Sequence, residues 1–223
     1  MLDFAANRRR MVDNQIRTAD VTHRPLLAAF DELAREGFLP EAAKPFAYSD
    51  RHLEIGRVEA TGEVRFALAP VLVARMLQAV EPVRGAKVLH IACGTCYASG
   101  IIAKLGAQVV ALDEDAGLIG MAETALAGAS ISGVKPVVGP LAAGVPDEAP
   151  FEVIFIEGAY QRQPSRLIAQ LAEGGRLIGV EGIGRTGQVM LQVKSGGTLT
   201  GRAVFDASAP LLSAFAAEPQ FAF

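Results

Sequence analysis

The chain alternates between short apolar runs and helix-like segments from residue 87 to residue 180. The apolar runs are rich in β-branched residues, and the segments between them carry apolar residues at helical spacing. The strand-like runs are 87–92, 107–112, 135–138, 151–156 and 175–180, and the helix-like segments are 97–105, 114–127 and 164–172. Such alternation is typical of a parallel sheet with helices on both faces. We therefore predict an α/β fold with a doubly wound, mostly parallel sheet.

The two ends of the chain depart from this alternation. Residues 1–20 have the pattern of a polar helix with few apolar contacts, and residues 38–62 show no periodicity. Near the other end, the runs 187–194 and 198–206 flank Ser195-Gly196-Gly197, which predicts an antiparallel hairpin at the sheet edge. The prediction is one domain over 1–223, in which 1–80 form an N-terminal helical cap segment and 81–223 a cofactor-binding core.

The charge balance limits the partners of the chain. It has 24 acidic and 21 basic residues, a net charge of −3. This balance lacks the basic excess of a nucleic-acid-binding or membrane-binding protein. No apolar run approaches the roughly 20 residues that span a bilayer. Two cysteines and an N-terminus without a secretory pattern predict a cytoplasmic protein. Oligomeric state is left open.

The run 87–92 leads through a turn into the helix-like segment 97–105. A strand, a turn and a helix in this order are where nucleotide-type cofactors bind in open α/β sheets. Gly94 gives the turn conformational freedom, but the turn has no second or third glycine. A pyrophosphate needs the glycine-rich loop for close approach, so NAD and FAD are disfavoured. A donor without a pyrophosphate, such as S-adenosylmethionine, is less demanding.

Asp113 ends the second strand-like run, nineteen positions after Gly94. An acid at about this distance is well placed to accept hydrogen bonds from a ribose diol. Asp113 is also suited to cap the helix-like segment 114–127, because Asp is a favoured N-cap residue. The spacing leaves both roles open.

Two cysteines flank Gly94. Cys93 and Cys96 form a C-x-x-C motif at a helix start, where a thiol pKa is lowered and redox chemistry is favoured. With His90 they also have an H-x2-C-x2-C spacing, although no fourth metal ligand is evident. The simplest interpretation is that small residues line a loop that formerly held glycines, so no metal is predicted.

Motifs along nearly the whole chain resemble those of the protein-L-isoaspartate O-methyltransferases. Arg10–Arg17 resembles the opening R-M-V-x-x-Q-[LI]-R of that family, and Ala69–Met76 resembles its Q-P-x-[IV]-[VI]-A-x-M. The other matching stretches are Phe38-Leu39-Pro40 with Ala47-Tyr48 and Ile55-Gly56, Val88–Tyr97 (V-L-E-I-G-x-G-S-G-Y), Val109–Asp113, Phe151–Ile156 and Leu171–Val180. Their shared order and spacing carry the resemblance.

The resemblance implies a Rossmann-like methyltransferase fold, S-adenosylmethionine as cofactor and S-adenosylhomocysteine as product. It implies methylation of isoaspartyl residues in damaged peptides or proteins, a form of protein repair. No catalytic base is predicted, since a carboxylate acceptor is already ionised at pH 7. The predicted cofactor-binding residues are His90, Ala92, Cys93, Gly94, Asp113, Glu114 and Gly139.

Departures from the family pattern fall on the binding positions. Residues 66–70 (FALAP) lack the hydroxyls and amide of the family's T-I-S-Q-P, and His90 replaces an acid. Ala92 and Cys96 replace two glycines, and 139–141 (GPL) lack the acid of G-D-G. Glu157 stands where the family has Thr or a small residue and is a candidate to take over a polar role. The alternative is therefore a catalytically inactive methyltransferase-fold module for ligand or protein binding, with a C-x-x-C thiol function as a third hypothesis.

Overall fold

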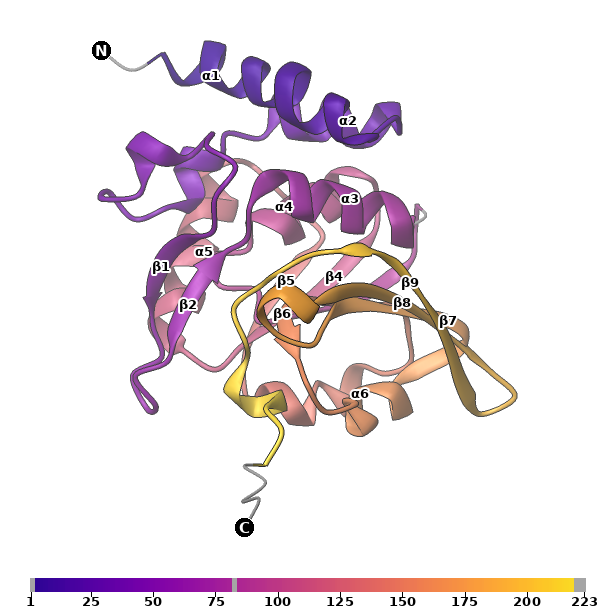
Figure 1. The fold of residues 1–223 in the computed structure, drawn as a ribbon. Helices are drawn as coiled ribbons and strands as arrows, with labels where there is room; N and C mark the ends of the chain where they lie inside the picture. Colours follow the sequence, from indigo (N-terminus) through magenta and orange to yellow (C-terminus); the bar gives the residue numbers. More distant parts are fainter. Residues whose placement is uncertain (1–2, 82–83, 219–223) are drawn as a thin grey trace.

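A seven-stranded sheet forms the centre of the computed structural model, which describes residues 3–81 and 84–218 (Figure 1). The strand order is β5-β4-β3-β6-β7-β8-β9, with β3 in the middle of the parallel part. Strands β3 to β7 pair in parallel, and β8 and β9 add antiparallel at the edge. Their bounds are β3 Lys87–Ile91, β4 Gln108–Asp113, β5 Val134–Val138, β6 Phe151–Tyr160, β7 Leu171–Glu181, β8 Gln188–Ser195 and β9 Thr198–Asp206. The predicted mostly parallel sheet and its antiparallel hairpin are confirmed.

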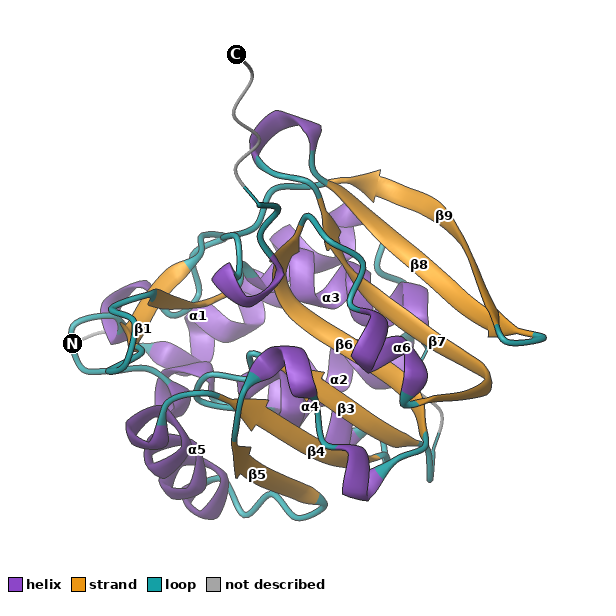
Figure 2. Ribbon diagram, turned by 90° about the horizontal axis from the view of Figure 1, so that it is seen from below, coloured by secondary structure: helices purple, strands orange, loops and turns teal. Residues whose placement is uncertain are grey.

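Helices cover both faces of the sheet (Figure 2). They are α1 Phe4–Met11, α2 Arg24–Glu32, α3 Pro70–Val80, α4 Tyr97–Lys104, α5 Ala116–Gly128 and α6 Ser165–Ala169. Successive side chains of a strand point to opposite faces, and the buried side chains accordingly fall into two clusters. Val88 packs in the cluster that includes side chains of α2 to α5. Leu89 and Ile91 pack in the other, with Leu167 of α6 and Leu212.

The polar helix predicted over residues 1–20 is divided into three parts. After α1 the chain forms a π turn over Val12–Ile16 and a 3₁₀ turn over Arg17–Ala19. Met11 and Ile16 are fully buried, so a few apolar contacts hold this segment on the body. None of the described helices is both long enough and apolar enough to cross a bilayer.

A two-stranded antiparallel ribbon lies within and just beyond the stretch predicted to be irregular. Strand β1 (Leu53–Arg57) pairs with β2 (Val64–Ala67), so the prediction of irregular structure is wrong for residues 53–57. The strands are four and five residues long, and a register shift interrupts their pairing between Glu54 and Gly56. Runs this short give too few alternations for a period of two to show.

A C-terminal segment crosses the end of β6. The backbone N–H of Ala159 donates to Pro210 O at 2.8 Å, and that of Leu212 donates to Ala159 O at 3.0 Å. Strand β6 therefore continues to Tyr160, four residues beyond its predicted end. Ser213 in the same segment donates hydrogen bonds to Glu63, the residue directly before β2. The segment thus contacts both the end of β6 and the ribbon.

Candidate functional site

The turn between β3 and α4 requires left-handed backbone conformations. Ala92, Gly94 and Cys96 have φ of 58°, 51° and 66°. A side chain in this region costs roughly 1–2 kcal/mol, which glycine avoids. The resemblance pairs Ala92 and Cys96 with glycines, and the backbone explains why. The turn is held in place by the Cys93 N–H, which donates to Leu112 O of β4 at 3.1 Å.

Asp113 lies beside this turn at the end of β4. Its Oδ2 accepts the Gly94 N–H at 2.9 Å, and its Oδ1 accepts the Glu114 N–H at 2.8 Å. The Gly139 N–H donates to the Asp113 carbonyl at 2.9 Å. Four predicted site residues, Gly94, Asp113, Glu114 and Gly139, therefore meet at the carboxyl edge of the sheet.

The N-cap of α5 is Asp115, whose side chain accepts the Leu118 N–H at 2.9 Å. The alternative role of Asp113 as the helix cap is therefore wrong. The Asp113 carboxylate faces the turn instead, so its role as a ribose-binding acid stays a prediction.

The β1–β2 ribbon lies directly over Gly94 and Asp113. Arg65 of β2 is buried, and its Nε lies 3.4 Å from Asp113 Oδ1 in an ion pair without a well-directed hydrogen bond. Its two terminal nitrogens pair with Glu63 at 2.8 Å and Glu114 at 3.2 Å. Ile55 of β1 reaches so close to Gly94 that its Cδ1 would lie 2.3 Å from a Cβ added there. The ribbon therefore covers the predicted cofactor turn.

His90 is fully buried and faces side chains of neighbouring elements. Its Nδ1 lies 2.7 Å from Ser99 Oγ of α4, and its Nε2 lies 3.0 Å from Glu157 Oε2 of β6. The second Glu157 oxygen accepts the Leu68 N–H at 3.2 Å. Where the family motif has an acid, this chain has His90, and Glu157 on the neighbouring strand places an acid beside it. This contact is the polar role considered for Glu157.

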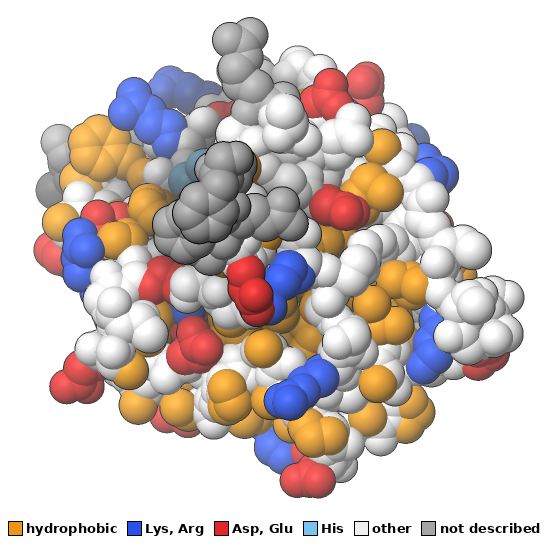
Figure 3. Space-filling model, turned by 60° about the horizontal axis from the view of Figure 1, so that its bottom comes forward, with side chains coloured by type: hydrophobic (Ala, Val, Ile, Leu, Met, Phe, Trp, Pro, Cys, Tyr) orange, Lys and Arg blue, Asp and Glu red, His pale blue; other side chains and the backbone are white. Residues whose placement is uncertain are grey.

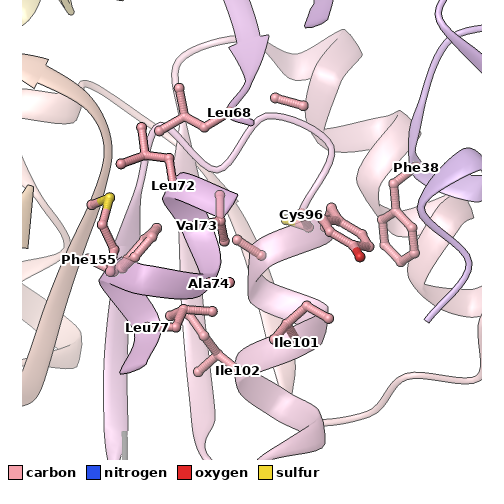
Figure 4. Close-up of a cluster of buried hydrophobic side chains, with 14 of the residues drawn as sticks. Phe38, Leu68, Leu72, Val73, Ala74, Leu77, Cys96, Ile101, Ile102 and Phe155 are labelled. Atoms are coloured by element: carbon pink, nitrogen blue, oxygen red, sulfur yellow. The ribbon is translucent and has the colours of Figure 1, made fainter. Parts of the chain in front are cut away.

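The two cysteines point into the core. Cys93 and Cys96 are buried and free, and Figure 4 shows Cys96 among apolar side chains of α3 and α4. Burial raises the pKa of the Cys93 thiol, and its hydrogen bond with Cys96 raises it further. A reactive thiol needs a lowered pKa and access to solvent, so this environment does not support a redox function. Among the described residues, no three His, Cys, Asp or Glu side chains are grouped to hold a metal ion.

Arg65 and Arg35 were not among the predicted site residues. Arg35 is buried, donates to Leu68 O at 2.8 Å and lies with its guanidinium carbon 4.9 Å from the centre of the Tyr97 ring. Burial lowers the pKa of Arg35. The Leu68 backbone is therefore held from both sides, because its N–H donates to Glu157 and its carbonyl accepts from Arg35. The only sequence signal for Arg65 was a single arginine in a short apolar run, and Arg35, which Glu36 follows directly, had none.

A cavity is present at a distance from the predicted site residues. A cavity of about 700 Å³ lies between α5 and residues 34–38, lined by Gly117, Gly120, Met121 and Thr124 among others. It contains none of the predicted site residues. On the face in Figure 3, the described acidic and basic side chains are intermixed, without a large area of one sign.

The sheet order, the turn after β3 and the acid at the end of β4 define the Rossmann-like fold that methyltransferases share. Two solved structures share this fold. A protein-L-isoaspartate O-methyltransferase is 24% identical, with a TM-score of 0.81 over 92% of this chain and 66% of its own. A putative protein-L-isoaspartate O-methyltransferase from Plasmodium falciparum, in complex with S-adenosyl-L-homocysteine, is 18% identical with a TM-score of 0.79, over 93% of this chain and 99% of its own.

Sequence comparison identifies the family. The Protein-L-isoaspartate(D-aspartate) O-methyltransferase family matches residues 6–205. Protein-L-isoaspartate O-methyltransferase 1 of Rhodopseudomonas palustris is 33% identical over 85% of this chain and 75% of its own length. A Gloeobacter violaceus relative is 36% identical over 75% and 79%. The chain belongs to the protein-L-isoaspartate O-methyltransferase family.

The covered site and the family's cofactor do not fit together in this conformation. Asp113 has the position and chemistry of a ribose acceptor, but both its oxygens are engaged and its side chain has no exposed surface. Arg65 and Ile55 fill the space above the turn. A nucleoside can reach Asp113 only after these two side chains have moved.

Proposed function

We propose that this protein is an S-adenosylmethionine-dependent carboxyl methyltransferase that acts on isoaspartyl residues of peptides or proteins. Family membership supports the activity, and the observation that carries it is the geometry of Asp113 against Gly94. The 2.9 Å hydrogen bond between them sets the acid beside the turn at the carboxyl edge of β3 and β4. Ligands bind at this edge in open α/β sheets.

The division of the chain follows from the same proposal. Residues 81–223 form the core that binds the donor, and residues 1–80 form a cap over it. Within the core, the binding residues are His90, Ala92, Cys93, Gly94, Asp113, Glu114 and Gly139. We place the protein in the cytoplasm, which its two unpaired cysteines support.

The methyl acceptor is a carboxylate, and the bound donor supplies the methyl group. Because a carboxylate is ionised at pH 7, the protein needs to align and desolvate the acceptor rather than deprotonate it. Leu68, at the position of a family hydroxyl, offers only backbone groups, and both are already bonded to Glu157 and Arg35. Acceptor recognition therefore falls to other groups at the edge of the site.

A second candidate is a methyltransferase-fold module that binds a ligand or a protein without transferring a methyl group. The buried Arg65–Asp113 pair favours it, because this pair engages the acid that we propose for the ribose. The two functions differ in whether product forms.

Methyl transfer from radiolabelled S-adenosylmethionine to an isoaspartyl peptide tests the proposal. The matched control is the same peptide with a normal aspartate. Labelled methyl ester on the isoaspartyl peptide alone supports the enzyme. Absence of label at millimolar donor, from protein that is shown to be folded, rejects it and leaves the binding module.

A further inference from the structure

The β1–β2 ribbon presents a cation to the ribose acid of the site. Arg65 is the only described basic residue paired with Asp113, and it is as deeply buried as the core side chains around it. A guanidinium is always charged at physiological pH and suits carboxylate geometry. Its partners Glu63, Asp113 and Glu114 come from the ribbon and from the end of β4. The ribbon and the sheet are therefore joined by charge at this point.

A nucleoside that binds at Asp113 must take over the acceptor that Arg65 now faces. Ribose hydroxyls donate hydrogen bonds to this type of acid. Arg65 Nε offers a positively charged N–H from a distance of 3.4 Å to the same carboxylate. The guanidinium and a ribose therefore compete for the space and the charge at Asp113, and Arg65 must withdraw for a ribose to lie against the carboxylate.

Ile55 adds a steric barrier to the electrostatic one. Its Cδ1 lies over Gly94 and covers the backbone of the turn that a ligand would contact. The two residues belong to neighbouring strands of one ribbon, so they leave the turn together when the ribbon lifts. Ser213 holds the ribbon from the C-terminal segment through Glu63.

Building on the proposed donor site, we infer that Arg65 determines its affinity, as an intramolecular competitor for Asp113 that the donor must displace. The apparent dissociation constant then equals the intrinsic one divided by the fraction of molecules in which the ribbon is open. The identity of residue 65 therefore sets how much donor the protein needs.

Titration calorimetry with S-adenosylhomocysteine tests this inference on the full chain. We expect Arg65→Ala to bind roughly tenfold more tightly than the wild type or better, because the open fraction rises. Arg57→Ala is the matched control, since Arg57 lies on the same ribbon and its contacts, Glu54 at 3.4 Å and the Gly62 carbonyl at 3.5 Å, are on the surface and away from Asp113. Its affinity should equal that of the wild type.

A variant without Arg65 leaves three carboxylates near one another, so its fold must be checked by circular dichroism. If Arg65→Ala does not fold, Ile55→Ala replaces it, because this change removes the steric barrier and no charge. We expect severalfold tighter binding for this variant.

The outcomes separate this inference from the proposed function. Equal affinity of the wild type and a folded Arg65→Ala variant overturns the competitor role, and the enzyme stands if both bind. Tighter binding to the variant without methyl transfer supports the competitor role and removes the enzyme. If the wild type and both folded variants fail to bind at millimolar ligand, both proposals fall.

Discussion

Replacing His90 by Glu, the acid of the family motif that Val88–Tyr97 resembles, should destabilise this protein in a pH-dependent way. In His90→Glu, the new carboxylate faces Glu157, whose Oε2 now lies 3.0 Å from the imidazole. Two unit charges about 4 Å apart repel by about 4 kcal/mol at an effective dielectric constant of about 20. The variant can avoid this repulsion by folding with one carboxyl group protonated.

Protonation limits the penalty and gives it a characteristic dependence on pH. A Glu with an unfolded pKa of about 4.3 costs about 4 kcal/mol to protonate at pH 7 and about 1 kcal/mol at pH 5. Its folded pKa lies above the unfolded one, so the destabilisation grows as pH rises above the unfolded value. At pH 7 the repulsion and the cost of protonation are similar, and about 4 kcal/mol is the expected maximum.

Urea denaturation at pH 7 and pH 5 measures this effect. His90→Gln is the control, because it also removes the imidazole but adds no charge. The free energy of unfolding of His90→Glu should lie below that of the control by about 4 kcal/mol at pH 7 and about 1 kcal/mol at pH 5. Adding Glu157→Thr should recover more than half of the loss at pH 7. An equal difference at both pH values, or no recovery in the double variant, would refute the predicted contact between the two carboxylates.

Three further predictions concern the turn and its surroundings. Hydrogen bonds from the Glu59 and Leu118 N–H groups lower the pKa of Asp115. Its contribution to stability is therefore present above the unfolded pKa of about 4 and is lost as pH falls through the folded pKa. Asp115→Asn should weaken this acid-induced loss of stability in thermal melts by a few tenths of a kcal/mol, since solvent reaches part of the group, and an unchanged acid dependence would contradict the prediction. Burial raises the pKa of Cys93, so iodoacetamide should label this cysteine only when the protein unfolds, as measured by mass spectrometry. Rapid labelling of Cys93 in the native protein would show an accessible thiolate instead. Gly94→Ala should lower the free energy of unfolding by about 1–3 kcal/mol, because the alanine takes a left-handed backbone and its Cβ meets Ile55. Adding Ile55→Val, which removes the clashing Cδ1, should restore part of this free energy in urea unfolding. If the effects of the two substitutions on the free energy of unfolding are strictly additive, the contact is ruled out.

The periodicity of the chain predicts the sheet well because β3, β4 and β6 each contain a mostly apolar run and each is followed by a helix. The end of β6 was missed, since Glu157 and Gly158 have the composition of a loop. They stay in the strand because Ala159 pairs with Val180 of β7 on one side and bonds on the other to the C-terminal segment, more than fifty residues further along the chain. Local pattern contains no information about a partner so distant.

The candidate site was predicted in part. The spacing between Gly94 and Asp113 correctly indicated that they lie together, because the register of parallel strands fixes which strand ends meet. The same pattern left open whether Asp113 binds a ribose or caps α5, and the folded structure assigns the cap to Asp115 instead. Arg65 was not predicted, because an arginine in a short strand is usually solvated and its burial depends on three acids that folding brings to it.

The position of β3 between β4 and β6 has a consequence for amide hydrogen exchange. Its backbone is bonded on both sides and covered on both faces, whereas β1 and β2 pair only with each other. Opening free energies within one protein range from near zero at edges up to the global value in the core. The amides of β3 should therefore exchange only through global unfolding, and those of the ribbon through local opening. The floor of the site belongs to the most protected part of the molecule and its cover to one of the least, so the site can be uncovered many times for each time that the molecule unfolds.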